Sequence, residues 1–71
     1  MPEPATVHVN GEARDAAGRS VAELVVDLGL PGDGRGVAVA IAGEVVPRGT
    51  WPSRTLVAGE HVEVLVAMQG G

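Results

Sequence analysis

Residues 5–16 read ATVHVNGEARDA, and this stretch predicts how the fold begins. Apolar and polar residues alternate over residues 5–9, which is the period-two pattern of a half-buried strand. Asn10-Gly11 follows at once and favours a type I′ turn, because both residues accept the positive φ angles that this turn requires. We therefore expect the chain to return antiparallel from Glu12 to about Ala16 as the second strand of a hairpin.

A short amphipathic helix is predicted after the hairpin. Ser20 and Glu23 have the spacing of a capping box, in which each side chain bonds a backbone N–H that the helix leaves unpaired. Gly29 is placed to end the helix in the left-handed conformation, and Pro31 prevents its continuation. The predicted helix covers residues 21–28, and its apolar stripe consists of Val21, Leu24, Val25 and Leu28.

Three further strands are predicted in the second half of the chain. Residues 37–41 alternate as VAVAI, so that the larger side chains would face the helix. Residues 44–46 form a short strand that Pro47 would confine to a sheet edge. Residues 61–67 form the longest strand, with its valines at 62, 64 and 66 directed towards the helix.

The connections between these strands are irregular. The segment of residues 31–36 holds one Pro and three Gly, which predicts a mobile surface loop. Trp51 is the only aromatic side chain besides the two histidines, and we expect it to close one open end of the small sheet rather than to bind a ligand. Arg48, three residues earlier, is expected to anchor the loop locally.

The order hairpin, helix, hairpin and strand predicts an α+β fold of the β-grasp, ubiquitin-like type. We expect a mixed four- to five-stranded sheet with one helix packed on one face. The first and last strands would lie parallel at its centre, and the other face would have no cover. Residues 1–67 would form a single β-grasp domain, and residues 68–71 would form a flexible C-terminal Gly-Gly tail.

Composition excludes several classes of function. The chain has 71 residues, no Cys and no Lys, and its net charge of −4 argues against nucleic acid as a partner. No apolar run is long enough to span a membrane, and the N-terminus lacks the pattern of a signal peptide. We therefore expect a soluble cytoplasmic protein with no nucleic-acid or membrane partner.

No conventional active site is apparent in the sequence. His8 and His61 are the only imidazoles, and both are expected to be ordinary surface residues rather than catalytic or metal-binding ones. The acidic residues are spread along the chain, which gives no support to paired-carboxylate catalysis. We expect no bound cofactor and no metal, and hence a protein that is not an enzyme.

The C-terminal sequence Gln69-Gly70-Gly71 is the candidate reactive segment. It follows directly on the strand predicted at the centre of the sheet. Four extended residues reach about 13 Å, far enough to carry the carboxylate of Gly71 into a cleft of another protein. Residues without Cβ suit a narrow channel, so Gly70 would permit the reaction and Gly71 would supply the reacting group.

The face of the sheet opposite the helix is the candidate docking surface. Leu65 would lie there beside Ala38 and Ala40, which together make a shallow apolar area close to the exit of the tail. Glu63 would lie at the rim of this area and orient a partner. Simple tolerance of apolar residues on a strand is the alternative explanation of the same pattern.

Together these stretches resemble the ThiS family, the sulfur carriers of thiamin thiazole biosynthesis. The resemblance rests on Asn10-Gly11-Glu12, on GVAVAI at 36–41, on EVVPR at 44–48 followed by Trp51, on GEHVE at 59–63, and on the Gln69-Gly70-Gly71 end. It departs from the family at two turns, where Ala42 stands in place of a frequent Asn and Ala58 in place of a common Asp.

The resemblance implies a protein cosubstrate without catalytic side chains. A ThiF-type adenylyltransferase would use ATP to adenylate the Gly71 carboxylate, and a sulfur donor enzyme would supply the sulfur that makes it a thiocarboxylate. Thiazole synthase, ThiG, would then receive the sulfur. Three alternatives remain open: the small subunit of molybdopterin synthase, a sulfur carrier of cysteine biosynthesis, and a β-grasp protein-binding module without sulfur chemistry.

Overall fold

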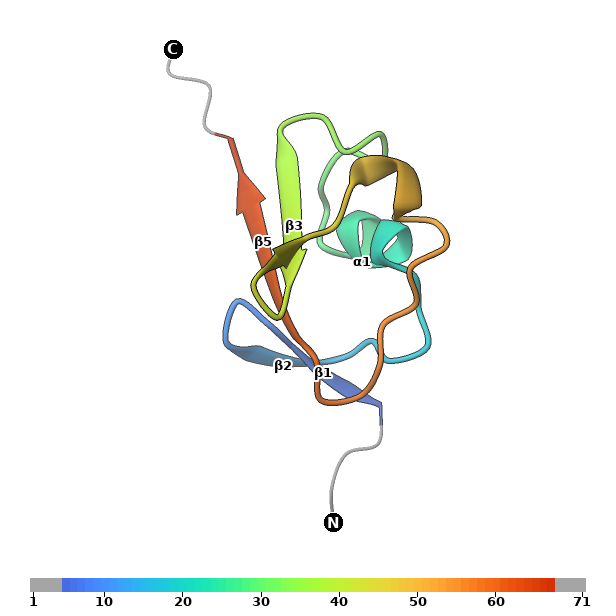
Figure 1. Ribbon diagram of the computed structural model, residues 1–71, viewed down its shortest axis with the longest axis vertical. Coiled ribbons are helices and arrows are strands. Elements are labelled where there is room, and N and C mark those ends of the chain that lie inside the picture. The colour runs from blue at the N-terminus through green and yellow to red at the C-terminus, as the bar shows by residue number, and fades with distance from the viewer. Residues whose placement is uncertain (1–4, 68–71) are drawn as a thin grey trace.

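The computed structural model describes residues 5–67, which form one five-stranded sheet and one α-helix (Figure 1). The sheet has the order β2-β1-β5-β3-β4 and contains both parallel and antiparallel pairs. The elements are β1 (Thr6–Val9), β2 (Glu12–Asp15), α1 (Val21–Asp27), β3 (Val37–Ile41), β4 (Glu44–Val45), a 3₁₀ turn (Arg48–Thr50) and β5 (His61–Val66). The α+β, β-grasp prediction is therefore confirmed.

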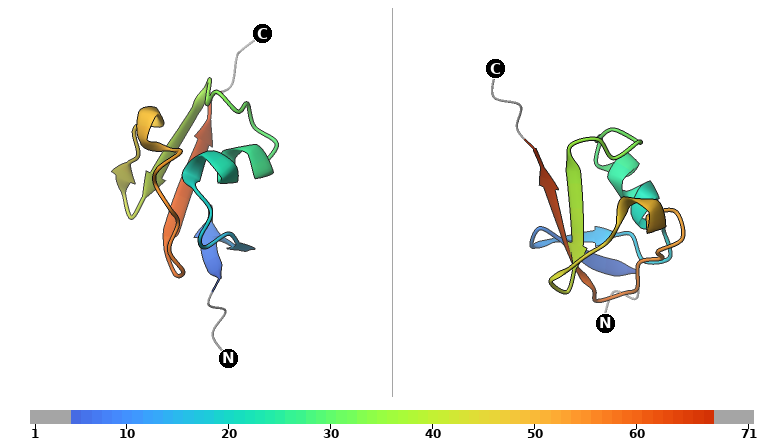
Figure 2. Two further views of the ribbon diagram at one scale, coloured as in Figure 1. Left: turned by 90° about the vertical axis from the view of Figure 1, so that its right-hand side faces the viewer. Right: turned by 45° about the horizontal axis from the view of Figure 1, so that its top comes forward.

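The sheet is built as the sequence predicts. β1 and β5 run parallel side by side, and β5 also pairs antiparallel with β3. β4 lies at an edge, in agreement with the Pro47 that follows it. Figure 2 shows α1 lying across one face of the sheet and leaving the opposite face without a helix.

The β1–β2 hairpin turns at Asn10 and Gly11, whose φ angles are 51° and 85°. Both values are positive, as the Asn-Gly sequence predicts for a type I′ turn. The register is set by the pair Val9 and Glu12 on either side of the turn. β2 ends at Asp15, one residue before the predicted end.

Helix α1 begins and ends through its predicted caps. The Ser20 hydroxyl accepts from the Glu23 N–H at 3.1 Å, and the Glu23 carboxylate accepts from the Ser20 N–H at 2.8 Å. At the C-terminal end, the N–H groups of Gly29 and Leu30 donate to the carbonyls of Val26 and Val25, which is a Schellman motif. The helix ends at Asp27, one residue earlier than predicted.

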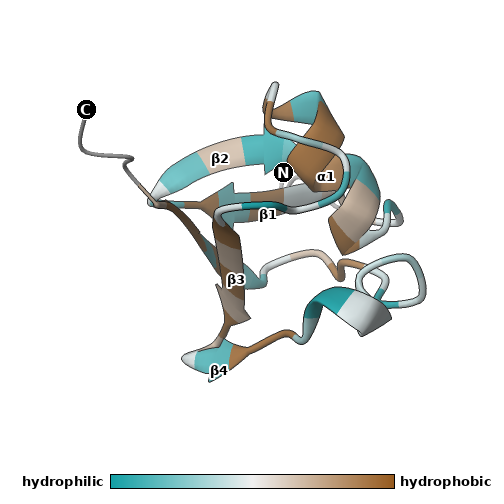
Figure 3. Ribbon diagram, turned by 90° about the horizontal axis from the view of Figure 1, so that it is seen from above, coloured by the Kyte–Doolittle hydropathy of each residue, from teal (hydrophilic) through white to brown (hydrophobic). Residues whose placement is uncertain are grey.

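The core lies between α1 and the facing side of the sheet, and Figure 3 shows the apolar residues of α1 and β3 that contribute to it. Its fully buried side chains are Leu24, Leu56, Val7, Val21, Val25, Val39 and Val62. Val66 lies on the same side of the sheet as the buried Val62 and Val64, as predicted, but it is 49% exposed. Among residues 5–67, β1 flanks β5 only at its start and leaves Val66 uncovered on that side.

Trp51 closes one end of the core, as predicted. It is 3% exposed, and its Nε1–H donates to the Val46 carbonyl at 2.9 Å. The glycine-rich loop packs directly on this ring, since a Cβ added at Gly34 would lie 2.6 Å from Trp51 Cζ3. The loop of residues 31–36 is thus fitted to the core more closely than its composition predicts.

Candidate functional site

The candidate site is organised around β5, the central strand that leads towards residues 68–71. The predicted reactive residues Gln69, Gly70 and Gly71 lie outside the described residues. The structure does describe how their anchor is held, because β5 pairs with β3 over five residues and with β1 at its beginning.

Asn10 holds the middle of β5 through its side chain. Its Oδ1 accepts from the Val64 N–H at 2.9 Å, and its Nδ2 donates to the Val64 carbonyl at 3.1 Å. Its backbone N–H donates to the Val62 carbonyl at 2.9 Å. The amide therefore continues the β1–β5 pairing for one residue after β1 has ended. The sequence predicts only the turn for Asn10, because no local signal indicates this second role.

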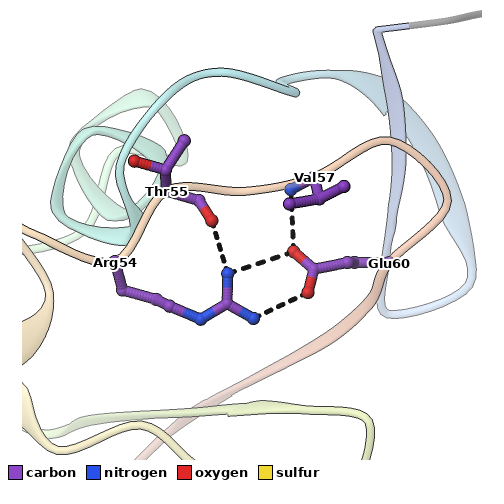
Figure 4. Close-up of polar contacts among 4 residues, drawn as sticks. All are labelled: Arg54, Thr55, Val57 and Glu60. Carbon is purple, nitrogen blue, oxygen red and sulfur yellow. Dashed lines mark hydrogen bonds and ion pairs between the residues drawn. The ribbon is translucent and has the colours of Figure 1, made fainter.

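The entry to β5 is held by a charged cluster (Figure 4). Arg54 bonds both carboxylate oxygens of Glu60, at 2.6 and 3.3 Å, and also donates to the Thr55 carbonyl. The Val57 N–H donates to Glu60 Oε1 at 2.8 Å. The hydrogen bond from Arg54 lowers the pKa of Glu60, and the bond from Val57 adds to this, while partial burial opposes it. Glu60 stays ionised and fixes the turn that precedes β5.

Four residues predicted to form the docking surface are brought together opposite α1. Ala38 pairs with Leu65 across β3 and β5, and Ala40 pairs with Glu63. Leu65 is 68% exposed, Ala38 and Glu63 are exposed, and Ala40 is half-buried. Cross-strand partners share a face, so these side chains form one continuous surface.

Val45 extends this surface and was missed by the sequence reading. It pairs with Ala40 from β4 and is 75% exposed, the largest value among the exposed large apolar residues. The signal was present, because the two-residue turn at Ala42-Gly43 fixes Val45 opposite Ala40. We call Ala38, Ala40, Val45 and Leu65 the apolar patch.

The two histidines meet on the same face of the sheet. His8 and His61 are register partners across β1 and β5, and their rings stack with centroids 4.8 Å apart and planes 14° apart. His61 is exposed, as predicted, whereas His8 is half-buried, and the sequence alone does not predict that they meet. Among residues 5–67, no group of three or more His, Cys, Asp or Glu side chains could hold a metal ion.

A shallow hollow of about 290 Å³ lies where β3 begins and β5 ends. It is lined by Gly36, Val37, Ala38, Arg48, Leu65, Val66 and Ala67. The Ala67 N–H donates to the Gly36 carbonyl at 2.6 Å, which keeps the chain paired to β3 up to the last described residue. Arg48 supplies the one charged side chain of this lining.

Comparison with known proteins places the chain among sulfur carriers. The model of the ThiS family matches residues 7–71. The sulfur carrier protein ThiS of Thermus thermophilus is 37% identical over 65 residues, which cover 92% of this chain and 98% of that protein.

Solved structures agree with this placement. The crystal structure of the thiamine biosynthesis protein ThiS from Geobacter metallireducens superposes with a TM-score of 0.73 at 32% identity, covering 93% of this chain and 99% of that one. A solution structure of a thiamine biosynthesis protein from the same organism gives the same score and identity, with 93% and 87% coverage. In the described part of this chain, no helix is long and apolar enough to cross a membrane.

Proposed function

Because this chain belongs to the ThiS family of sulfur carrier proteins, we propose that the carboxylate of Gly71 is the group that carries the sulfur. The family match extends through Gly71, and it favours the thiamin pathway over the molybdopterin, cysteine and non-sulfur alternatives. In this proposal residues 1–67 are the folded domain, and residues 68–71, which include Gln69, Gly70 and Gly71, are the tail that enters the partners.

The proposed chemistry has two steps. A carboxylate oxygen of Gly71 attacks the α-phosphorus of ATP held by a ThiF-type adenylyltransferase, forming an acyl-adenylate and releasing pyrophosphate. Sulfide from a sulfur donor enzyme then attacks the activated carbonyl and displaces AMP, which leaves a thiocarboxylate for the thiazole synthase ThiG. A terminal carboxylate is ionised at neutral pH and can act as the nucleophile of the first step.

The absence of cysteine supports this assignment. With no Cys in the chain, the sulfur cannot be carried as a persulfide on a side chain, which agrees with its transport on the carboxylate of Gly71. The protein would then act as a cosubstrate, and the catalytic groups and the ATP site would belong to its partners.

Two observations together carry the proposal: the family match extends through Gly71, and side-chain contacts hold β5 at two points. Glu60 fixes the entry to this strand, and Asn10 fixes its middle. A strand held at two points presents the residues that follow it from a constant position, which favours delivery of a terminus into a cleft.

Mass spectrometry of the intact protein tests the proposal. Incubation with a ThiF-type enzyme, ATP and a sulfur source should produce the mass gain of one oxygen exchanged for sulfur. One Ala added after Gly71 should abolish this gain without changing the thermal midpoint, whereas one Ala added before Met1 should leave it intact. Normal sulfur transfer to the C-terminally extended protein would show that Gly71 is not the reacting residue.

We also propose that the apolar patch, with Glu63 at its rim, is the surface on which the adenylyltransferase and thiazole synthase dock. Because both would use the same surface, their binding should be mutually exclusive. Leu65→Glu should weaken capture of the adenylyltransferase about 30-fold, the equivalent of about 2 kcal/mol for an interface anchor.

The matched control for Leu65→Glu is Val26→Glu. Val26 is also an exposed apolar residue, at 57%, but it lies on α1 on the other side of the sheet. Calorimetry measures the affinity of each folded variant for the adenylyltransferase. It therefore separates an effect at Leu65 from a general effect of the added negative charge. Equal affinities of the two variants would move the docking surface away from Leu65.

A further inference from the structure

In the described part of the chain, the central strand β5 has one backbone edge that is left open near its C-terminal end. Its backbone groups alternate between its two neighbours, as in any strand. The His61 carbonyl and the Ala67 N–H are bonded on the β3 side, to Ala42 and Gly36. Odd-numbered residues of β5 therefore direct their backbone groups towards β3.

Even-numbered residues of β5 direct their backbone groups towards β1. Asn10 bonds the Val62 carbonyl through its backbone and both backbone groups of Val64 through its side chain. The same alternation places the N–H and C=O of Val66 on the β1 side.

No described strand covers this edge at Val66. The β1–β5 register ends at Val9 and Val62, and the chain then turns through Asn10 and Gly11 into β2. Within residues 5–67, neither β1 nor its turn supplies a partner for the two backbone groups. The exposed side chains of Leu65 and Val66 leave the strand accessible from both faces.

We propose that this edge receives an extended segment of the adenylating partner, which continues the sheet beside β5 where β1 stops. This inference rests on the proposed function. Backbone pairing at a sheet edge satisfies an N–H and a C=O at once and needs no particular side chain on the incoming strand. The partner would thereby hold the base of the tail independently of the apolar patch.

The length of the chain argues for this occupant. Five residues, 67–71, follow Val66, and fully extended they span at most roughly 18 Å. An enzyme that binds the Gly71 carboxylate must therefore bring the groups that bind it within that distance of the open edge, so its surface lies beside the edge. An acyl-adenylate also reacts with water, so the enzyme that forms it gains from closing around the chain that carries it.

A second copy of this chain is the weaker candidate. Asn10 occupies the groups of Val64, so the described open edge is a single donor and acceptor pair at Val66. Short, capped edges are a common device against pairing between identical sheets. The Asn10 side chain, which already bonds Val64, would also stop a partner strand from pairing with β5 further towards β1.

Hydrogen exchange at three consecutive amides tests the proposal directly. In the free carrier, the amides of Leu65 and Ala67 should exchange slowly because they pair with β3, whereas that of Val66 should exchange quickly. With excess ThiF-type enzyme and no ATP, the Val66 amide should become at least about tenfold slower, the effect of one hydrogen bond at the strong end of its range. Exchange is stopped with acid and read by NMR of the released carrier.

A pair of variants adds an affinity measurement. Val66→Pro removes the N–H, and Val66→Ala keeps it while shortening the side chain. Capture of Val66→Pro should be about tenfold weaker than capture of Val66→Ala. If the proline ring disturbs β5, replacement of Val66 by the corresponding α-hydroxy acid deletes the same donor without the ring, and it should weaken capture similarly.

The outcomes distinguish this inference from the function on which it rests. If the enzyme binds and the thiocarboxylate forms while the Val66 amide still exchanges as fast as in the free carrier, the edge pairing is refuted and the proposed function stands. Protection of Val66 in the concentrated free carrier, or only with thiazole synthase, would also refute it. If the wild type is never adenylated, both proposals fail.

Discussion

Replacing Gly34 with alanine should destabilise this domain far more than the same change at another glycine with positive φ. Gly34 has a φ of +74°, which costs a residue with a Cβ about 1–2 kcal/mol. The new Cβ would also lie 2.6 Å from Cζ3 and 2.9 Å from Cη2 of Trp51. Overpacking of this kind costs about 1–3 kcal/mol. We expect a total loss of about 2–5 kcal/mol in the free energy of unfolding.

Gly18→Ala provides the matched control. Gly18 has a φ of +90°, and an added Cβ there would meet nothing within 4 Å. It should therefore lose only the conformational part, about 1–2 kcal/mol. The difference between the two variants measures the contact with Trp51. The ring has little freedom to withdraw, because it is buried and its Nε1–H is bonded to the Val46 carbonyl.

Urea unfolding followed by fluorescence is the assay. Trp51 is the only Trp, and the chain has no Tyr or Phe, so the signal reports this ring alone. If Gly34→Ala loses no more stability than Gly18→Ala, the packing of the loop on Trp51 has been misjudged. A second check makes both alanine substitutions in a protein that carries Trp51→Leu, with unfolding followed by circular dichroism. Without the indole ring, Gly34→Ala and Gly18→Ala should lose about the same free energy of unfolding.

Three further predictions concern the core, the charged cluster and the clamp on β5. Leu24→Ala should cost about 2–5 kcal/mol in urea unfolding, because Leu24 is fully buried between α1 and the sheet, and a loss below about 1 kcal/mol would contradict that placement. The lowered pKa of Glu60 means that its ionised form stabilises the fold above the ordinary Glu pKa, and that this contribution is lost as pH falls through the lowered value. The free energy of unfolding should therefore fall less steeply in acid for Glu60→Gln than for the wild type. Parallel curves for the two proteins would contradict the assignment. Asn10→Gly keeps the turn but removes both side-chain bonds, so it should cost about 1–3 kcal/mol and speed hydrogen exchange at Val64, while unchanged exchange there would show that the clamp does not hold β5.

Features that depend on neighbouring residues in the chain could be predicted from the sequence. The capping box at Ser20 and Glu23 and the Asn10-Gly11 turn are local, because the groups that bond or bend lie within a few residues of one another. The predicted helix and strand ends accordingly differ from the observed ones by at most one residue. Three of the four residues of the apolar patch, Ala38, Ala40 and Leu65, are predicted as well, since strand alternation fixes which side chains share a face.

Features that depend on where another strand stops could not be predicted. Alternation correctly put Val66 in phase with Val64, but it says nothing about how far β1 extends, and Val66 is exposed for that reason. The stacking of His8 on His61 depends in the same way on the register of a parallel pair far apart in sequence. The alternation of a strand shows on which face of the sheet a residue lies, but it does not show whether another element covers that residue.

Asn10 shows how the two kinds of information combine. The turn needs a residue that accepts positive φ, and Gly, Asn and Asp all do so readily. The clamp on Val64 needs one side-chain donor and one acceptor at the distance of a backbone amide. Gly has neither group, and an ionised Asp has no donor. Asn alone of the three meets both demands, so one residue ends β1, turns the chain and closes the edge of β5 up to Val64, leaving the next pair of backbone groups, at Val66, for a partner.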